Sequence, residues 1–362
     1  MLIIDAHLDL SWNALQGNRD LLSSAYTIRV HERGMPEKGR AQGTVAFPEM
    51  RQGRIAVSFV TLFARSTGQA TPHVDYASLA QSYGVAQGQL AYYHALAHDG
   101  HVHILTERDN LDSHVAEWEA WENAEPTDTS NTSNTPPLGF VISLEGADPI
   151  HNPDQLEEWV NGGLRLLGLS HYGPGRYAGG TGTEIGLTEL GPRLLAEMER
   201  LGVLLDLTHC SDQAFWEALE RYHGLVLASH NNCRALVPHQ RQFSDEQLRA
   251  IFERSGVIGT AFDAWMLQPG WITGKSSNQT VTLNTVVDHI DHICQLAGNS
   301  HHAAIGTDLD GGYGREQSPS DLDTIADLQK LAGLLAARGY NADDITAIMH
   351  GNWLRFLREA WT

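Results

Sequence analysis

Residues able to bind a metal ion or to move a proton follow short apolar segments at several places in this sequence. The first is the string Asp5-Ala6-His7-Leu8-Asp9, which comes directly after the apolar residues 1–4. In a β-strand, residues two apart project to the same side, so His7 and Asp9 are expected to point the same way. An imidazole and a carboxylate that converge at the end of a buried strand make up half of a metal site.

Further residues of the same chemical types stand at the ends of other strand-like segments. They are Glu145, His171, His209, His230 and Asp308. Imidazole and carboxylate donors without thiolate suit one or two Zn²⁺ or similar ions. Two such ions about 3.5–4 Å apart can share a hydroxide that is nucleophilic near neutral pH, and Glu145 is the carboxylate best placed to bridge them. A remaining His and a remaining Asp fit an oxyanion stabiliser and a proton acceptor, so the chemistry indicated is hydrolysis.

The segments that position these residues are predicted to be parallel strands, because most of them are short and continuously apolar. They cover residues 2–9, 55–63, 140–144, 164–170, 203–208, 225–229, 257–262 and 303–307. Amphipathic patterns predict helices between them, clearest over 187–201, 212–222, 245–254 and 283–297, and Ser211 and Ser244 are start signals for two of these. Alternating strands and helices favour an α/β fold of the (β/α)₈ TIM-barrel type, in which the strand ends open onto one face. A doubly wound open sheet is the structural alternative.

The whole chain, residues 1–362, is predicted to be one catalytic barrel domain, because no internal repeat divides it. Within it the segment 124–137 (AEPTDTSNTSNTPP) is polar, contains proline and is rich in Ser, Thr and Asn. Such a composition is typical of an exposed loop.

Composition excludes several classes of partner. The net charge is −20, from 24 basic and 44 acidic residues, which argues against nucleic acid or an anionic membrane as the main partner. The three cysteines, Cys210, Cys233 and Cys294, have no paired spacing that would indicate a disulfide framework or a thiolate zinc site. No apolar run approaches the ~18 residues of a membrane span and no secretory leader is recognisable, so the expected location is the cytoplasm.

A series of motifs resembles one family of enzymes. The strings DAHLDL, SLEGAD, LSHYG, LDLTHCS, ASHNNCRAL, RQFSDEQ, IGTDLDGG and GNWLRF occur in this order between residue 2 and about residue 357. Their order and spacing are similar to those of the renal (membrane) dipeptidase family of zinc metallopeptidases. The resemblance implies an amidohydrolase-type barrel that uses two zinc ions to cleave dipeptides, and a homodimer.

The resemblance also implies roles for individual residues. His7 and Asp9 would hold one metal, His209 and His230 the other, and Glu145 would bridge the two. His171 would polarise the scissile carbonyl and stabilise the tetrahedral intermediate. Asp308 would take the proton from the bridging water and return it to the leaving amine, with Asp310 as the second choice for this role.

Arg241 lies in RQFSDEQ, eleven residues after His230, and matches the family arginine that holds the terminal carboxylate of the substrate. A guanidinium can bind a carboxylate through two parallel hydrogen bonds, although Arg234 competes nearby. The chain departs from the family pattern at Leu8, where an asparagine is common, and in the loop after His171, which should border the pocket for the substrate side chains. Trp265 is a further candidate for the pocket wall.

The sequence therefore predicts a binuclear zinc dipeptidase that acts on unblocked dipeptides, including those with a D-residue at the C-terminal position. The first alternative is a related binuclear amidohydrolase that acts on N-acyl amino acids, lactones or cyclic amides. The second alternative is a metal-binding protein without catalytic activity, which the presence of both Asp308 and His171 disfavours.

Overall fold

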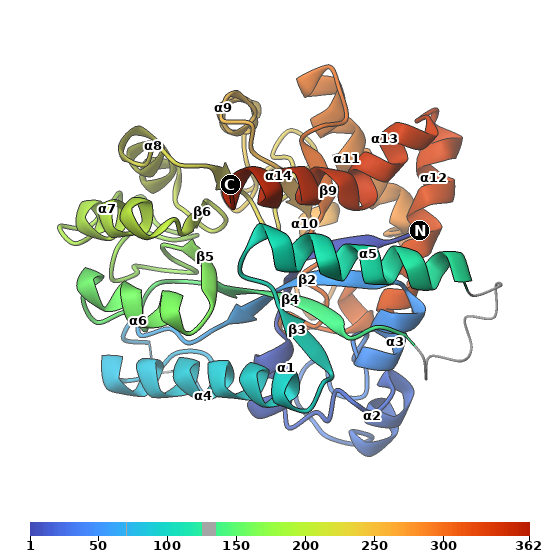
Figure 1. Cartoon of the computed structure of the whole chain (residues 1–362), viewed down its shortest axis with the longest axis horizontal. Coiled ribbons are helices and arrows are strands. Elements are labelled where there is room, and N and C mark those ends of the chain that lie inside the picture. Colours follow the sequence, from blue (N-terminus) through green and yellow to red (C-terminus); the bar gives the residue numbers. More distant parts are fainter. Residues whose placement is uncertain (70, 125–134) are drawn as a thin grey trace.

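The computed structural model describes residues 1–69, 71–124 and 135–362, and its centre is a ring of parallel strands (Figure 1). The strands are β1 (Ile3–Leu8), β2 (Ile55–Leu62), β3 (Val102–Ile104), β4 (Leu138–Leu144), β5 (Leu164–Gly168), β6 (Leu204–Asp206), β7 (Val226–Leu227), β8 (Ile258–Thr260) and β9 (Ala303–Ile305). Their order in the sheet is β7-β6-β5-β4-β2-β1-β9-β8, and the bridge between Ala228 and Ile258 joins its two ends. The predicted TIM barrel is confirmed.

Strand β3 is the element of this sheet that the sequence analysis did not predict. It pairs with Leu138–Phe140 at the start of β4, while β5 pairs with Ile142–Leu144 at the end of β4. Strand β3 is three residues long, and only one of those residues, Val102, is buried. Its sequence therefore lacks the continuous apolar run that marks the strands buried on both faces.

Helices surround the ring and bury its outer face (Figure 1). They are α1 (Leu10–Leu15), α2 (Ala25–His31), α3 (Phe47–Gln52), α4 (Leu79–His98), α5 (Arg108–Ala124), α6 (Leu156–Asn161), α7 (Gly191–Leu201), α8 (Asp212–Arg221), α9 (Asp245–Glu253), α10 (Ala264–Leu267), α11 (Leu283–Ala297), α12 (Lys330–Arg338), α13 (Ala342–Thr346) and α14 (Asn352–Ala360). The start signals at Ser211 and Ser244 act as predicted, because each hydroxyl accepts a hydrogen bond from a backbone N–H of the helix that follows.

The predicted loop over residues 124–137 falls mostly outside the described residues. Ala124 is the last residue of α5, residues 125–134 are not described, and Pro136 is buried. The carbonyl of Pro137 accepts a hydrogen bond of 2.9 Å from the Trp118 side chain. Within the described part of the chain, no helix is both long enough and apolar enough to cross a membrane.

A buried carboxylate in the middle of β1 links this strand to the segment that directly follows β9. Asp5 accepts hydrogen bonds from the Thr307 N–H at 2.8 Å and from the Thr307 hydroxyl at 2.6 Å. The N–H of Asp308 in turn donates to the carbonyl of His7 at 3.2 Å. These bonds bring His7 and Asp308 together although they lie at opposite ends of the sequence.

Close backbone packing marks the closure between β7, β8 and β9. A Cβ atom added at Gly259 would lie 2.0 Å from the carbonyl oxygen of Ser229, and one added at Gly306 would lie 1.8 Å from the same oxygen. Only glycine fits at these two positions, because any side chain would collide with the backbone that precedes His230.

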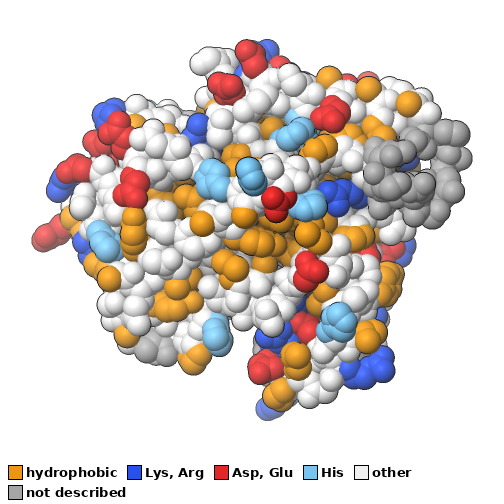
Figure 2. Space-filling model, turned by 60° about the horizontal axis from the view of Figure 1, so that its bottom comes forward, with side chains coloured by type: hydrophobic (Ala, Val, Ile, Leu, Met, Phe, Trp, Pro, Cys, Tyr) orange, Lys and Arg blue, Asp and Glu red, His pale blue; other side chains and the backbone are white. Residues whose placement is uncertain are grey.

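The surface is mixed in character. Figure 2 shows one face on which hydrophobic side chains are scattered among polar ones and several histidine side chains lie near the middle. All three cysteines are buried and free.

Candidate metal centre and active site

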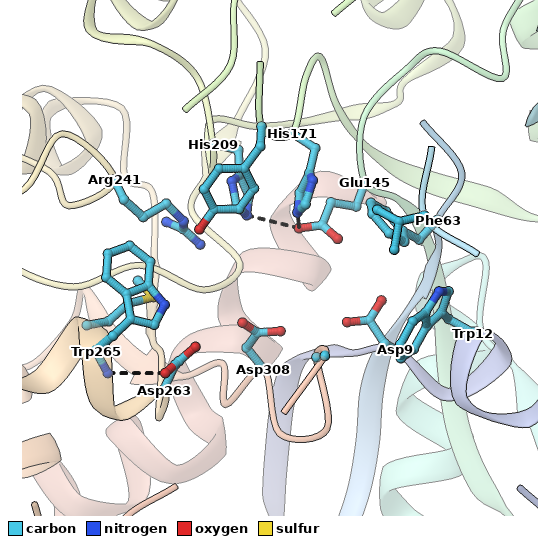
Figure 3. Close-up of a pocket in the computed structure, with 15 residues that line it drawn as sticks. Asp9, Trp12, Phe63, Glu145, His171, His209, Arg241, Asp263, Trp265 and Asp308 are labelled. Carbon is cyan, nitrogen blue, oxygen red and sulfur yellow. Dashed lines mark hydrogen bonds and ion pairs between the residues drawn. The ribbon is translucent and has the colours of Figure 1, made fainter. Parts of the chain in front are cut away.

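The strand ends predicted to carry chemistry meet at one pocket with an empty volume of about 630 Å³. It is lined by Asp9, Glu145, His171, His209, Arg241 and Asp308, together with aromatic and small residues. His7 and His230 lie behind this wall and are 2% and 1% exposed. Figure 3 shows Asp9, Glu145 and Asp308 pointing toward a common centre. The structure thus brings all eight predicted site residues together.

Glu145 lies between two groups of ligand-type atoms. Its Oε2 atom is 3.7 Å from Nε2 of His7. Its Oε1 atom is 3.1 Å from Nε2 of His209 and 3.3 Å from Nε2 of His230. Glu145 therefore belongs both to a group with His7 and Asp9 and to a group with His209 and His230.

The spacing within these groups suits metal coordination. Two ligand atoms bound to one tetrahedral Zn²⁺ at 2.0–2.1 Å lie about 3.4 Å apart. Nε2 of His7 is 3.7 Å from Oδ2 of Asp9, and Nε2 of His209 is 3.2 Å from Nε2 of His230. Nε2 of His7 and Oδ1 of Asp9 are buried and have no hydrogen-bond partner. Buried polar atoms are normally satisfied, so these two fit the donor atoms of a metal ion.

Hydroxyl groups contact the other ring nitrogen of each histidine in the two groups. Nδ1 of His7 lies 3.4 Å from the Thr61 hydroxyl, Nδ1 of His209 lies 3.1 Å from the Thr181 hydroxyl, and Nδ1 of His230 lies 2.9 Å from the Ser229 hydroxyl. Such contacts orient the imidazole and leave Nε2 free to bind a metal. The sequence analysis missed Thr61 and Thr181. Only Ser229, next to a predicted ligand, gives a local signal.

The backbone turns sharply where two of the site residues leave their strands. His209 has φ of 66° and Asp308 has φ of 58°, both in the left-handed region. For residues other than glycine this conformation is uncommon and concentrates at functional sites. Here it occurs three residues after the end of β6 and of β9, at two residues that line the pocket.

Electrostatics at the site favour bound cations. Burial raises the pKa of Glu145 and of Asp308, because the nearby carboxylates and the low polarity disfavour their charged forms. Burial lowers the pKa of His171, His209 and His230, which keeps these imidazoles neutral and their lone pairs available. A cluster of buried carboxylates is costly without positive charge, and divalent cations would supply it. The residues present therefore fit a metal centre.

A guanidinium fixes the protonation of His171. The Arg65 Nη1 atom lies 3.3 Å from Nδ1 of His171. A guanidinium can only donate, so Nδ1 of His171 is the acceptor and the proton of the neutral ring is on Nε2. Nε2 lies 3.7 Å from Oε1 of Glu145 and is thus presented to the pocket as a hydrogen-bond donor. The sequence analysis missed Arg65, which carries no motif signal.

The two candidate arginines have different surroundings. Arg241 is buried, lines the pocket, and donates to the carbonyl of His230 at 2.9 Å, while its Nε atom has no partner. Arg234 lies outside this pocket and forms a two-pronged ion pair with Asp212 at 2.6 and 2.9 Å. Arg241 is therefore the arginine that a bound anion can reach.

Asp310 is not placed for acid–base chemistry in the pocket. Its carboxylate accepts hydrogen bonds from the N–H groups of Thr44 and Val45 and lies 3.4 Å from the Arg19 guanidinium. Asp310, the second choice for the proton acceptor, would share a face with Asp308 only if the strand continued, but the strand ends at Ile305 and both residues have positive φ.

The remaining pocket wall is largely apolar. Phe63 and Trp12 lie on one side of the carboxylates, and Arg241 and Trp265 on the other (Figure 3). Trp265 lines the pocket, as does Tyr172 from the loop after His171. The pocket also contains Asp263, which accepts a 2.6 Å hydrogen bond from Gln317 and was not singled out by the sequence analysis.

Comparison with known proteins gives the family. The sequence profile of the membrane dipeptidase family, peptidase family M19, matches residues 1–362. The chain belongs to this family. It is therefore a hydrolytic enzyme of a metallopeptidase family, as the motifs predicted.

Individual relatives are distant. The chain is 31% identical over 233 residues to a protein in the pqqA 5′ region of Klebsiella pneumoniae, which covers 62% of this chain and 83% of that protein. It is 31% identical over 232 residues to dipeptidase tcpJ of Claviceps purpurea, and this match spans about half of that protein, 51%, and 61% of this chain. A Rhodobacter sphaeroides metallopeptidase has the same fold, with a TM-score of 0.78, 23% identity, and coverage of 100% of this chain and 99% of that one.

Proposed function

We propose that this member of the family hydrolyses the amide bond of unblocked dipeptides at a centre of two Zn²⁺ ions. The observation that carries the proposal is the pair of donor groups that share Glu145, next to a buried arginine with an unpartnered Nε atom. The donors support two ions rather than one, because the two oxygens of Glu145 face different histidines.

His7 and Asp9 would hold the first ion, His209 and His230 the second, and Glu145 both. Bound ions of this kind polarise a carbonyl and lower the pKa of a shared water molecule, so that it can attack near neutral pH. His171 would donate its Nε2 hydrogen to the carbonyl oxygen of the scissile amide as negative charge develops there. Asp308 would accept the proton of the attacking water and deliver it to the leaving amine.

Arg241 would bind the carboxylate of the substrate and so fix its length. Trp265, on the same side of the pocket, would flank the C-terminal residue, and Phe63 and Trp12 would contact the N-terminal side chain. The free amino group would lie near the metal centre and its carboxylates. Because both charged ends of the substrate would be bound, a third residue would move one end away from its partner, so tripeptides are expected to be poor substrates.

A D-residue at the C-terminal position is expected to be accepted. The Rhodobacter sphaeroides metallopeptidase with this fold was solved with a phosphinate mimic of the dipeptide L-Ala-D-Ala. For the present chain we infer the same tolerance, because Arg241 holds the carboxylate and the neighbouring wall is formed by a flat aromatic ring, Trp265.

The test is a substrate panel on zinc-loaded protein, with products read by mass spectrometry. The panel contains L-L and L-D dipeptides, the same dipeptides with a C-terminal amide, N-acetyl dipeptides, tripeptides, and a set of lactones and cyclic amides. The expected result is cleavage of free dipeptides alone, abolished by a chelator and restored by Zn²⁺. Arg241→Met should raise KM for free dipeptides, whereas Arg234→Met, outside the pocket, should not.

Two results would contradict the proposal. Activity confined to N-acyl compounds, lactones or cyclic amides would assign the chain to a neighbouring amidohydrolase function. A single bound ion at full activity would contradict the binuclear centre. The homodimer and the cytoplasmic location stay predictions, which the mass of the protein in solution and fractionation of cells would test.

A further inference from the structure

A second group of metal-ligand side chains lies outside the pocket, on the outer side of the barrel. Nδ1 of His103 on β3 is 3.2 Å from Nδ1 of His114 on α5, and 4.0 Å from Oε2 of Glu117 on the same helix. One ligand atom of each lies within 4.8 Å of the others. We propose that these three residues form a second metal site, for a borderline divalent cation such as Zn²⁺, Co²⁺, Ni²⁺ or Cu²⁺.

The neutral ring of His114 carries its hydrogen on the nitrogen that faces away from His103, which leaves the other nitrogen able to bind a metal. Its Nε2 atom lies 2.8 Å from the carbonyl oxygen of Ala56 on β2. A carbonyl can only accept, so Nε2 carries the hydrogen of the neutral ring and Nδ1 is left with a free lone pair. A backbone carbonyl on the second nitrogen is the usual support of a metal-binding histidine. This lone pair points at His103.

The geometry is close to that of a chelate. Ligand atoms on one tetrahedral Zn²⁺ lie about 3.4 Å apart, and the two Nδ1 atoms are already 3.2 Å apart. His114 is 2% exposed, whereas His103 and Glu117 are each 47% exposed. His114 is thus fixed in the protein interior, whereas His103 and Glu117 are accessible to an ion from solvent.

The local charge is favourable for a cation. The groove in which the three residues lie is also lined by Glu107 and Asp109, and no lysine or arginine lines it. Imidazole nitrogen with carboxylate oxygen is the donor set of zinc, cobalt, nickel and copper sites, rather than of calcium or magnesium sites. Three protein ligands leave one or more positions for water.

The site is separate from the pocket. His103 pairs with Gly139 at the start of β4, whereas Glu145 follows the end of the same strand. At about 3.3 Å per residue, these two positions on β4 are about 20 Å apart. A Cβ atom at Gly139 would lie 2.5 Å from Nε2 of His114, so this glycine leaves the space that the ring occupies. An ion here would connect β3 to α5 (Figure 1).

The test counts bound metal in two exposed-ligand variants. Whole chains of the wild type, His103→Ala and Glu117→Gln are equilibrated with micromolar Zn²⁺ by dialysis, and the metal per chain is measured by plasma mass spectrometry. The ions of the pocket are common to all three and cancel in the difference. The wild type should bind one ion per chain more than His103→Ala, and Glu117→Gln should bind the extra ion at least about tenfold more weakly.

The matched control is His223→Ala. His223 is 80% exposed and lies 3.2 Å from Glu199, but among the described residues it belongs to no group of three metal-ligand side chains. It should leave the metal count unchanged. Cu²⁺ should also give an electron paramagnetic resonance signal with nitrogen couplings that is lost in His103→Ala, and the third ion should slow hydrogen exchange in α5.

Equal metal counts in the wild type and His103→Ala would overturn the proposal and leave an ordinary hydrogen bond between two histidines. Loss of the same ion in His223→Ala would also overturn it, because the binding would then be nonspecific. His114 is not exchanged in this test, since its removal would leave a cavity and an unpaired carbonyl. The metal count is independent of any activity, so the inference does not depend on the proposed function.

Discussion

Each of the four histidines at the pocket has a hydrogen-bond partner on Nδ1, and that partner determines whether Nε2 carries a hydrogen or a free lone pair. Thr61, Thr181 and Ser229 contact Nδ1 of the three histidines grouped with Glu145, whereas Arg65 contacts Nδ1 of His171. A hydroxyl can accept a hydrogen from Nδ1 and leave Nε2 as a bare ligand, but a guanidinium cannot. The four histidines are thereby divided into three proposed metal ligands and one proposed hydrogen-bond donor.

Replacement of Arg65 by methionine should test this division. Without the guanidinium, the ring of His171 can place its hydrogen on Nδ1, and the donor to the substrate carbonyl is lost. We expect kcat to fall about 10²-fold, with metal content unchanged, and Arg65→Lys to recover part of the activity because an ammonium also only donates. An unchanged kcat in Arg65→Met, measured with a free dipeptide, would contradict the role of Arg65.

Asp308 is the residue on which proton transfer is proposed to depend. Asp308→Asn keeps the shape of the side chain but cannot take a proton, so kcat should fall about 10²–10⁴-fold with little change in KM. Metal content, measured on the same samples, should be retained. Loss of an ion instead would show that Asp308 acts as a ligand, since it lies within 4.8 Å of ligand atoms of His7 and His230.

At the scale of elements, the link between β1 and β9 positions residues from both ends of the chain. Asp5→Ala removes the acceptor for the N–H and hydroxyl of Thr307 and for the N–H of His7, so three buried donors lose this partner. The free energy of unfolding should fall by about 2–4 kcal/mol. Chemical denaturation, followed by circular dichroism, measures this change.

The control for this variant lies opposite Asp5 on β2. Ser58 pairs with Asp5 in register, and its buried hydroxyl has no partner. Ser58→Ala removes a polar atom that forms no hydrogen bond, so its effect on stability should be small. A similar loss in both variants would mean that the strand position, rather than the carboxylate, determines the stability.

The helices and strands that could be predicted from the sequence are those in which apolar residues recur at the spacing of the element. Helix α11 matches its predicted bounds, 283–297, because apolar residues repeat along one face, and the two long strands β1 and β2 are buried throughout and mostly apolar. Helix α4 was not among the clear patterns, because its buried face includes the polar residues Ser82 and Gln89, which interrupt the apolar repeat. Seven of the eight site residues were accessible to sequence reasoning because their types are reactive and they lie in or after the predicted strands, whereas Arg241 follows no strand and was indicated by the family resemblance. Arg65, Thr61 and Thr181 were not, since only the folded chain shows which ring nitrogens they contact.

At the scale of the whole molecule, a buried histidine outside the pocket affects the response to acid. His289 on α11 is 1% exposed and its Nδ1 accepts a 3.1 Å hydrogen bond from the Cys233 N–H. Burial lowers the pKa of His289 to about 3. In the unfolded chain this histidine takes up a proton as the pH falls below 6.5, whereas in the folded chain it stays neutral until about pH 3. The contribution of the neutral His289 to the free energy of unfolding is therefore fully present above pH 6.5 and is lost as the pH falls toward 3.

Between pH 7 and pH 4, the free energy of unfolding is expected to fall by about 3 kcal/mol because of His289. His289→Asn can still accept the hydrogen bond but does not titrate, so its stability should fall less over this range. Denaturation midpoints of the wild type and the variant, measured at pH 7, 5.5 and 4, give the difference directly. If the denaturation midpoints of the wild type and His289→Asn fell in parallel with pH, the contribution of His289 would be contradicted. The control is His223→Ala, which removes an exposed histidine and should give the same dependence of the midpoint on pH as the wild type.

The two glycines against the Ser229 carbonyl have a consequence for how the chain tolerates change over evolution. Gly259 and Gly306 allow the ring to close, and the same carbonyl immediately precedes His230. A mutation that adds a methyl group at either position would displace His230, a proposed metal ligand, while it opens the barrel, so closure of the barrel and the proposed metal binding would fail together. Inherited substitutions at Gly259 or Gly306 would therefore change the barrel and its candidate active site at the same time.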